Sequence, residues 1–290
     1  MEEMQVNSTL KPFEPTFMFE FERKFQPEPN LRWFYNNWHL SIVFSMVYVV
    51  LVFAGRRFME SRQPFDLRIP LAVWSAALAA FSWTGMIRFA IGAFDVLRTH
   101  GLDASICNPV LFKGMAGFWL WVFTLSKLPE LIDTAFIVLR KQNLIFLHWY
   151  HHITVLMYAW YSYPQTVALA GSFCLMNFTV HSLMYSYYAI RASRLLRIPS
   201  WVGMVITTLQ ITQMLVGCVV NGYAYWKIQN GGYCSTNEQN MTVSSIMYFS
   251  YLLLFLNFFI GRYLSKPSSG GKRKDRNQNG ASSLEQKKGL

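Results

Sequence analysis

Residues 241–261 read MTVSSIMYFSYLLLFLNFFIG, a run without a single Lys, Arg, Asp or Glu. A helix of about 20 apolar residues crosses the hydrocarbon core of a bilayer, so this run has the composition and length of a membrane span. Four further runs also lack these charged residues, at 40–55, 69–87, 166–190 and 200–226. We therefore expect an all-α integral membrane protein.

Two more segments, 114–139 and 144–163, have the required length but carry polar side chains. Counting them predicts seven transmembrane helices. Only 14% of the 290 residues are charged and 53% are hydrophobic, whereas a soluble domain carries about 25% charged residues. We divide the chain into an N-terminal segment 1–37, a seven-helix membrane domain 38–263 and a basic tail 264–290, which we expect to be disordered.

Basic residues are unevenly distributed between the two sides of this arrangement. Most of them lie in the loops at 56–68, 140–141 and 191–197 and in the tail. The opposite loops are poorer and hold Arg88, Arg98, Lys113 and Lys227. Cytoplasmic loops are enriched in Lys and Arg, which predicts a lumenal N-terminus and a cytosolic C-terminus. The net charge of +11 then faces anionic lipid and anionic substrates, and nucleic acid is not an expected partner because no soluble basic domain would hold it.

Cysteines and sequons add expectations about the lumenal side. Cys107 and Cys234 fall in two different loops there, and an oxidising compartment favours a disulfide between them, with two free thiols as the alternative. Sequons at Asn7 and Asn240 predict glycosylation on the same side.

The C-terminus ends in KKGL, which places Lys287 and Lys288 at the fourth and third positions from the end. This ending resembles the dilysine retrieval signal of endoplasmic reticulum membrane proteins. We therefore expect a multi-pass protein of the endoplasmic reticulum membrane.

Three imidazoles lie within the span 144–163, in the stretch HWYHH at 148–152. A spacing of i, i+3, i+4 places His148, His151 and His152 on one face of a helix. Titratable groups are costly at membrane depth. A single histidine there could be a satisfied core residue, but three on one face favour a reactive site.

Three further polar groups occur in the spans. Lys127, Glu130 and Asp133 are spaced by three, so Lys127 and Glu130 are close enough to pair, and a structural ion pair is as well supported as a catalytic role. The other two groups are Asn177, His181, Tyr185 and Tyr188, followed by Arg191, in one segment, and Gln210 and Gln213 in the next. For the glutamines, interhelical hydrogen bonding and substrate contact are both consistent with the pattern.

Four of these segments, taken in order, resemble the motifs of the ELOVL fatty-acid elongases. HWYHH at 148–152 is similar to their HxxHH box, and KLPELIDT at 127–134 is similar to KxxExxDT. Residues 177–185 fit NxxxHxxMY, and residues 207–213 fit TxxQxxQ. Within the family, the likeness is closest to the members that act on saturated and monounsaturated chains and prefer palmitoyl groups.

The resemblance implies a 3-ketoacyl-CoA synthase, the condensing enzyme of fatty-acid elongation in the endoplasmic reticulum. It would extend a long-chain acyl-CoA by two carbons from malonyl-CoA, with loss of carbon dioxide and one CoA. It also implies that six helices form a barrel around an acyl-chain tunnel closed at its lumenal end, with the first helix outside. No cofactor is implied beyond these substrates. Membrane lipid and the other enzymes of the elongation cycle are the expected partners, and a homo-oligomer stays open.

We assign the residues as follows. A neutral imidazole is nucleophilic near pH 7, so His151 would carry the acyl group as an acyl-imidazole, while His181 would stabilise the oxyanion or the enolate. His148 and His152 would orient the nucleophile, and a carboxylate would fix a histidine tautomer. The candidates for that carboxylate are Asp133 and Glu130. The competing mechanism keeps both substrates bound together and uses a histidine only as a general base.

The remaining polar residues would bind the substrates. Asn177 and Gln210 are expected as positioning donors, and Lys127 and Arg191 as partners of the CoA phosphates and the malonyl carboxylate. Tyr185, Tyr188 and Gln213 complete the expected substrate-binding set.

Two other classes compete with this interpretation. A membrane di-iron desaturase or hydroxylase also has histidine boxes, but two of the six histidines, His39 and His100, lie outside the site spans. The four that remain are too few to hold two irons, so no metal site is expected. A seven-helix receptor or transporter fits the span count, but it does not need three histidines on one face beside a charged triplet.

Overall fold

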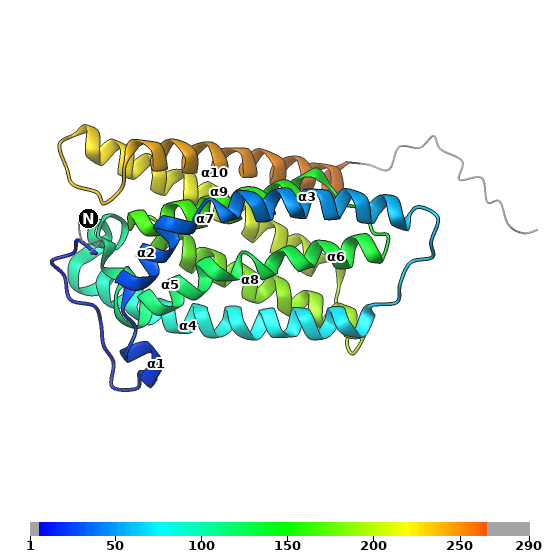
Figure 1. The fold of residues 1–290 in the computed structure, drawn as a ribbon, viewed down its shortest axis with the longest axis horizontal. Helices are drawn as coiled ribbons and strands as arrows, with labels where there is room; N and C mark the ends of the chain where they lie inside the picture. The colour runs from blue at the N-terminus through cyan, green and yellow to red at the C-terminus, as the bar shows by residue number, and fades with distance from the viewer. Residues whose placement is uncertain (1–5, 266–290) are drawn as a thin grey trace, which may run out of the picture.

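The computed structural model describes residues 6–265, and within them the chain is entirely helical, without a strand. Long helices run side by side as a bundle, and the short helices α1 and α2 lie at one end of it (Figure 1). The long elements are α3 (Leu40–Met59), α4 (Arg68–Cys107), α5 (Gly114–Ser126), α7 (Phe146–Ser162), α8 (Ala170–Ser193), α9 (Ser200–Gln229) and α10 (Glu238–Phe259). The short ones are α1 (Glu20–Arg23), α2 (Pro27–Asn37), η1 (Pro109–Phe112), η2 (Pro129–Leu131), α6 (Ile132–Leu139), η3 (Tyr163–Gln165) and η4 (Ile260–Leu264).

Four helices are long and apolar enough to cross a membrane: α3, α4, α9, and α10 continued through η4. They contain the uncharged runs 40–55, 69–87, 200–226 and 241–261. The protein is therefore a multi-pass integral membrane protein.

The remaining expected spans are shorter or more polar. Residues 114–139 are not one helix, because α5 ends at Ser126 and Pro129, which has no backbone N–H to continue the ladder, starts the short η2 before α6. Helix α7 has only 17 residues. Helix α8 has 24 residues but carries Asn177 and His181 on its buried face.

Helix α4 extends well beyond the expected span at 69–87. Arg88 and Arg98 were expected in a loop, but both lie inside α4, which bends at Gly101, a glycine with φ +79°. Arg88 is tolerated there because its guanidinium forms a buried ion pair with Glu22 of α1. The N-terminal segment thus packs into the bundle through this pair.

A disulfide joins Cys107, the last residue of α4, to Cys234 in the connection between α9 and α10, as expected. Around it, Ser235 N donates to Cys107 O at 2.9 Å and Ala168 N donates to Ser235 O at 2.8 Å. These contacts bring the α4, α7–α8 and α9–α10 connections together at one end of the bundle, which we call the disulfide end.

Two of the basic loops meet at the opposite end. Lys141 donates hydrogen bonds to Glu60 O at 3.1 Å and to Arg62 O at 3.0 Å. The loops at 56–68 and 140–141 therefore lie on one side of the bundle, as the charge pattern predicted.

The two sequons differ in the folded chain. Asn7 is exposed, and its glycosylation stays a prediction. Asn240 is completely buried, and its Nδ2 donates to Gln165 Oε1 at 2.6 Å, so the expectation of a glycan on this side chain is wrong for the folded protein. Lys287 and Lys288, and the tail expected to be disordered from 266 onward, lie outside the described residues.

Candidate functional site

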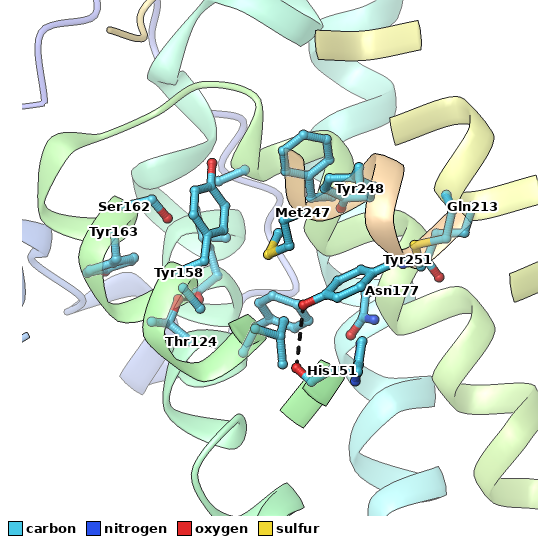
Figure 2. Close-up of a pocket in the computed structure, with 17 residues that line it drawn as sticks. Thr124, His151, Tyr158, Ser162, Tyr163, Asn177, Gln213, Met247, Tyr248 and Tyr251 are labelled. Carbon is cyan, nitrogen blue, oxygen red and sulfur yellow. Dashed lines mark hydrogen bonds between the residues drawn. The ribbon is translucent and has the colours of Figure 1, made fainter. Parts of the chain in front are cut away.

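An apolar cavity runs through the middle of the bundle between five of the long helices, α5, α7, α8, α9 and α10. Along α7 it is lined by His151, Val155, Tyr158 and Ser162, which recur every three to four residues and so share one helical face. Eleven residues of helix cover about 16 Å, so the cavity extends over about three turns. His151, Asn177 and Gln213 lie at one end of it, and Ser162 and Tyr163 lie at the other, next to the disulfide end (Figure 2).

The three histidines of α7 cluster on one face, as their spacing predicted. The ring centres of His148 and His152 are 4.5 Å apart, and those of His151 and His152 are 5.6 Å apart. Of the three, only His151 lines the cavity, and its ring lies 5.0 Å from that of Tyr251. Tyr251 also donates to the backbone oxygen of His151 at 3.4 Å (Figure 2). His151 is thus the imidazole best placed to meet a ligand in the cavity.

Lys127 and Glu130 form the expected ion pair, with Lys127 Nζ 2.7 Å from Glu130 Oε1. The ammonium also donates to Asn177 Oδ1 at 3.0 Å, and Asn177 Nδ2 lies 3.2 Å from His181 Nε2. These four side chains form a continuous buried network between α5, η2 and α8. Only 1% of Lys127 is exposed, and its ammonium is paired with Glu130 and bonded to Asn177. A contact between Lys127 and the CoA phosphates stays a prediction.

Neither carboxylate of the KLPELIDT segment bonds to an imidazole in the described part of the chain. His148 Nε2 lies 2.9 Å from Thr134 Oγ1, so a hydroxyl takes the place in which we expected Asp133 or Glu130. The expectation that one of these carboxylates fixes a histidine tautomer is therefore wrong for the hydrogen bonds of this structure. The Thr134 hydroxyl, in the first turn of α6, reaches His148 of α7. The neighbouring Asp133 carboxylate instead accepts hydrogen bonds from other helices.

The Asp133 carboxylate accepts hydrogen bonds from two other helices. Trp74 of α4 donates its indole N–H to Oδ1 at 2.6 Å, and Tyr185 of α8 donates its hydroxyl to Oδ2 at 2.7 Å. One carboxylate thereby connects α4, α6 and α8. Tyr185, which is buried, supports this junction and does not line the cavity.

The other expected substrate-binding residues are spread along α8 and α9. Gln213 is buried and lines the cavity, whereas Gln210 does not line it and contacts Met184 Sδ at 3.4 Å. Tyr188 is 43% exposed, and Arg191, near the end of α8, bonds to the Tyr187 hydroxyl. The structure therefore does not bring Tyr188 and Arg191 to the cavity.

Several lining residues were not singled out from the sequence. Half of them come from α7 and α10, including Tyr158, Ser162, Met247, Tyr248 and Tyr251. Their i, i+3, i+4 spacing is the only signal in the sequence, and it is shared by every buried helix face. Within residues 6–265, no group of three or more His, Cys, Asp and Glu side chains is arranged to hold a metal ion.

Comparison with known proteins adds an independent finding. Residues 33–271 match the family described as ELO: GNS1/SUR4. The chain is 48% identical over 255 residues to very long chain fatty acid elongase 6 of Gallus gallus, covering 88% of this chain and 96% of the relative. It is 44% identical over 262 residues to the protein of the same name in Drosophila melanogaster, covering 89% and 83%. It is 39% identical over 272 residues to very long chain fatty acid elongase 3 of Homo sapiens, covering 93% and 96%.

Proposed function

The chain belongs to the ELO: GNS1/SUR4 family, and from that membership we propose that it is the condensing enzyme of fatty-acid elongation. In finer terms, we propose a very-long-chain 3-oxoacyl-CoA synthase. It joins a long-chain acyl-CoA to malonyl-CoA and releases 3-ketoacyl-CoA, carbon dioxide and CoA. The observation that carries the proposal is the apolar cavity with His151 and Asn177 at one end. A desaturase and a receptor have no comparable support.

We propose seven transmembrane segments, with α5, η2 and α6 together forming the third. Helices α5, α7, α8, α9 and α10 contribute the lining of the cavity, and neither α3 nor α4 contributes to it. Helix α4 packs against the lining helices α5, α8 and α9, whereas α3 packs against α6 and α7, which supports a barrel with the first helix outside. The basic loops would face the cytosol, and the disulfide end would face the lumen of the endoplasmic reticulum. Other enzymes of the elongation cycle would take up the product.

The acyl chain would occupy the cavity from His151 towards the disulfide end. Its lining is largely apolar and aromatic, which suits an alkyl chain and keeps water away from the reacting carbonyl. Because the cavity reaches its far end near Tyr163, the thioester would lie at the His151 end. The relatives named as elongases 6 and 3 support long-chain substrates in general.

In the first step, an imidazole nitrogen of His151 attacks the thioester carbonyl carbon. The C–S bond breaks, CoA leaves as the thiol with the imidazole proton, and the acyl group stays on His151. In the second step, malonyl-CoA loses carbon dioxide, and the electron pair of the broken C–C bond forms the new bond to the acyl carbon. The acyl–nitrogen bond breaks, and the leaving imidazolate takes up one proton from solvent, which restores neutral His151 and gives 3-ketoacyl-CoA.

The network around His181 would stabilise the negative charge that develops in both steps. The Lys127 ammonium donates a hydrogen bond to Asn177 Oδ1, and Asn177 Nδ2 lies 3.2 Å from His181 Nε2. The Lys127–Glu130 pair fixes the orientation of Asn177, so the polar side chains of Asn177 and His181 would be held in place to support an oxyanion.

An assay with purified protein, palmitoyl-CoA and malonyl-CoA labelled in its C2 carbon tests the proposed function. We expect labelled 3-ketoacyl-CoA and one carbon dioxide per product, and we expect both to be lost in His151→Ala while the protein stays folded. If the wild-type protein gives no 3-ketoacyl-CoA, the proposal is wrong. If His151→Ala keeps its activity, the assignment of the site is wrong.

A further inference from the structure

Helix α3 lies outside the cavity, yet one of its side chains is connected to the histidine cluster. The Tyr48 hydroxyl lies 2.6 Å from Thr134 Oγ1, and Thr134 Oγ1 lies 2.9 Å from His148 Nε2. Tyr48 is 6% exposed and Thr134 is completely buried. Three helices, α3, α6 and α7, are therefore joined by a short chain of polar groups that ends on an imidazole.

The surroundings of Tyr48 are otherwise apolar. It packs in a cluster with Val52, Met59 and Val138, and Thr134 is its one side-chain hydrogen-bond partner in the described part of the chain. A buried hydroxyl in such surroundings costs free energy unless it is hydrogen-bonded. The hydrogen bond to Thr134 therefore offsets the cost of burying the Tyr48 hydroxyl.

Two proton arrangements fit the distances, because either hydroxyl can donate and His148 Nε2 can donate or accept. The stronger donor character of the phenol favours one of them. The hydroxyl of Thr134 has one proton to donate and lies between two partners. A phenol is a better donor and a poorer acceptor than an aliphatic hydroxyl, so Tyr48 donates to Thr134. Thr134 is then free to donate its own proton to His148 Nε2. An Nε2 that accepts a hydrogen bond leaves the proton of the neutral ring on Nδ1.

We propose that Tyr48 is a positioning residue of the condensation reaction, which acts through Thr134 to hold His148 in one orientation and in the Nδ1–H tautomer. This inference rests on the proposed function and extends it to a residue outside the four sequence motifs. The ring of His148 lies 4.5 Å from that of His152, and the ring of His152 lies 5.6 Å from that of His151, so a fixed His148 also restricts the packing of the nucleophile.

Removing the phenol hydroxyl changes the proton arrangement while the packing is kept. In Tyr48→Phe, Thr134 can turn its proton away and accept from His148 Nε2–H, so both tautomers of His148 become accessible. We expect kcat to fall about tenfold, by analogy with the outer partners that orient metal-bound histidines. The KM values for both substrates should be unchanged, because Tyr48 does not line the cavity.

The test compares five variants in the condensation assay, with the wild-type protein as reference. Thr134→Ser keeps the hydroxyl and should retain activity close to that of the wild type. Thr134→Val should lose at least as much kcat as Tyr48→Phe, and the double variant should lose no more than Thr134→Val, because groups that act as one chain are not additive. Tyr223→Phe is the matched control, since it removes a tyrosine hydroxyl bonded to Asp103 near the disulfide end and should have no effect on kcat.

The outcomes separate this inference from the proposed function. If the wild-type protein condenses the substrates but Tyr48→Phe keeps its kcat, or if the losses of the two single variants simply multiply, Tyr48 has no positioning role. A change in KM alone would also overturn the proposal. If the wild-type protein forms no 3-ketoacyl-CoA, both the proposed function and the role of Tyr48 are overturned.

Discussion

The ammonium of Lys127 donates to Asn177 Oδ1 across 3.0 Å and thereby connects the KLPELIDT segment with α8. Asn177 lines the cavity on the same side as His151, and its amide nitrogen holds His181. A charged residue that does not line the cavity is thus bonded, directly or through Asn177, to two residues of the site. Spacing alone left a structural ion pair and a catalytic role open for Lys127, and the structure shows the ion pair together with a contact to Asn177.

Lys127→Met should destabilise the protein by roughly 3–5 kcal/mol, because it leaves the buried Glu130 carboxylate without its counter-charge. The double variant with Glu130→Gln should recover most of the thermal midpoint in detergent, since the unpaired charge is gone. It should not recover condensation activity, because Asn177 has lost its anchor. Lys24→Met is the control, since its pair with Glu20 is exposed and worth little. A double variant with full activity would contradict the role of Lys127.

Glu22 should make the stability of the protein sensitive to acid. Burial alone would raise the pKa of this carboxyl, but hydrogen bonds from Arg88, Trp119 and the amide of Phe19 outweigh it and hold the pKa below its usual value. The stabilisation is therefore complete above the unfolded-state pKa of about 4.3, and it is lost as the pH falls through the lower folded-state pKa.

Thermal midpoints measured in detergent between pH 7 and pH 3 test this dependence. Glu22→Gln should lower the midpoint at pH 7 and flatten its decline at acid pH relative to the wild type. Glu20→Gln, in the same short helix, should behave like the wild type because that side chain is exposed. If the thermal midpoints of the wild type and Glu22→Gln fell in parallel as the pH is lowered, the Glu22 carboxyl would not be the cause of the acid sensitivity.

Gly217 sets the distance between α9 and α10 beside the cavity. A Cβ at this position would lie 2.2 Å from the ring of Tyr248, which lines the cavity. Gly217→Ala should therefore push the ring aside at a cost of about 1–3 kcal/mol. We expect kcat/KM to fall more for long acyl-CoA substrates than for short ones.

Gly222→Ala is the matched control on the same helix, because an added Cβ there meets nothing within 4 Å. It should leave activity unchanged, with a stability equal to or above that of the wild type. If both variants lost the same activity, the replacement of glycine by alanine in α9, and not the contact with Tyr248, would explain the loss.

Local features of the site could be predicted from the sequence because they depend on spacing along one helix. The shared face of His148, His151 and His152 and the pair of Lys127 with Glu130 are features of this kind. The Cys107–Cys234 disulfide was also predictable, because charge patterning placed both loops on one side.

The rest depends on contacts between helices that are distant in sequence. Thr134 and not a carboxylate meets His148, because Trp74 and Tyr185 already occupy Asp133. No periodicity in the sequence shows which of two neighbouring polar side chains will form a hydrogen bond with a helix that is distant in sequence. The buried state of Asn240 is similar, since its partner Gln165 lies 75 positions away.

The central claim is that His151 carries the acyl group, and intact-protein mass spectrometry followed by peptide mapping tests it most directly. The purified protein is incubated with palmitoyl-CoA alone, and His151→Ala is treated in parallel. We expect the mass to rise by one acyl group on the peptide that contains His151, with an equal amount of free CoA released, and neither change in the variant. The absence of both an adduct and free CoA, in a protein that condenses once malonyl-CoA is added, would contradict the acyl-histidine route and favour a reaction between two bound substrates.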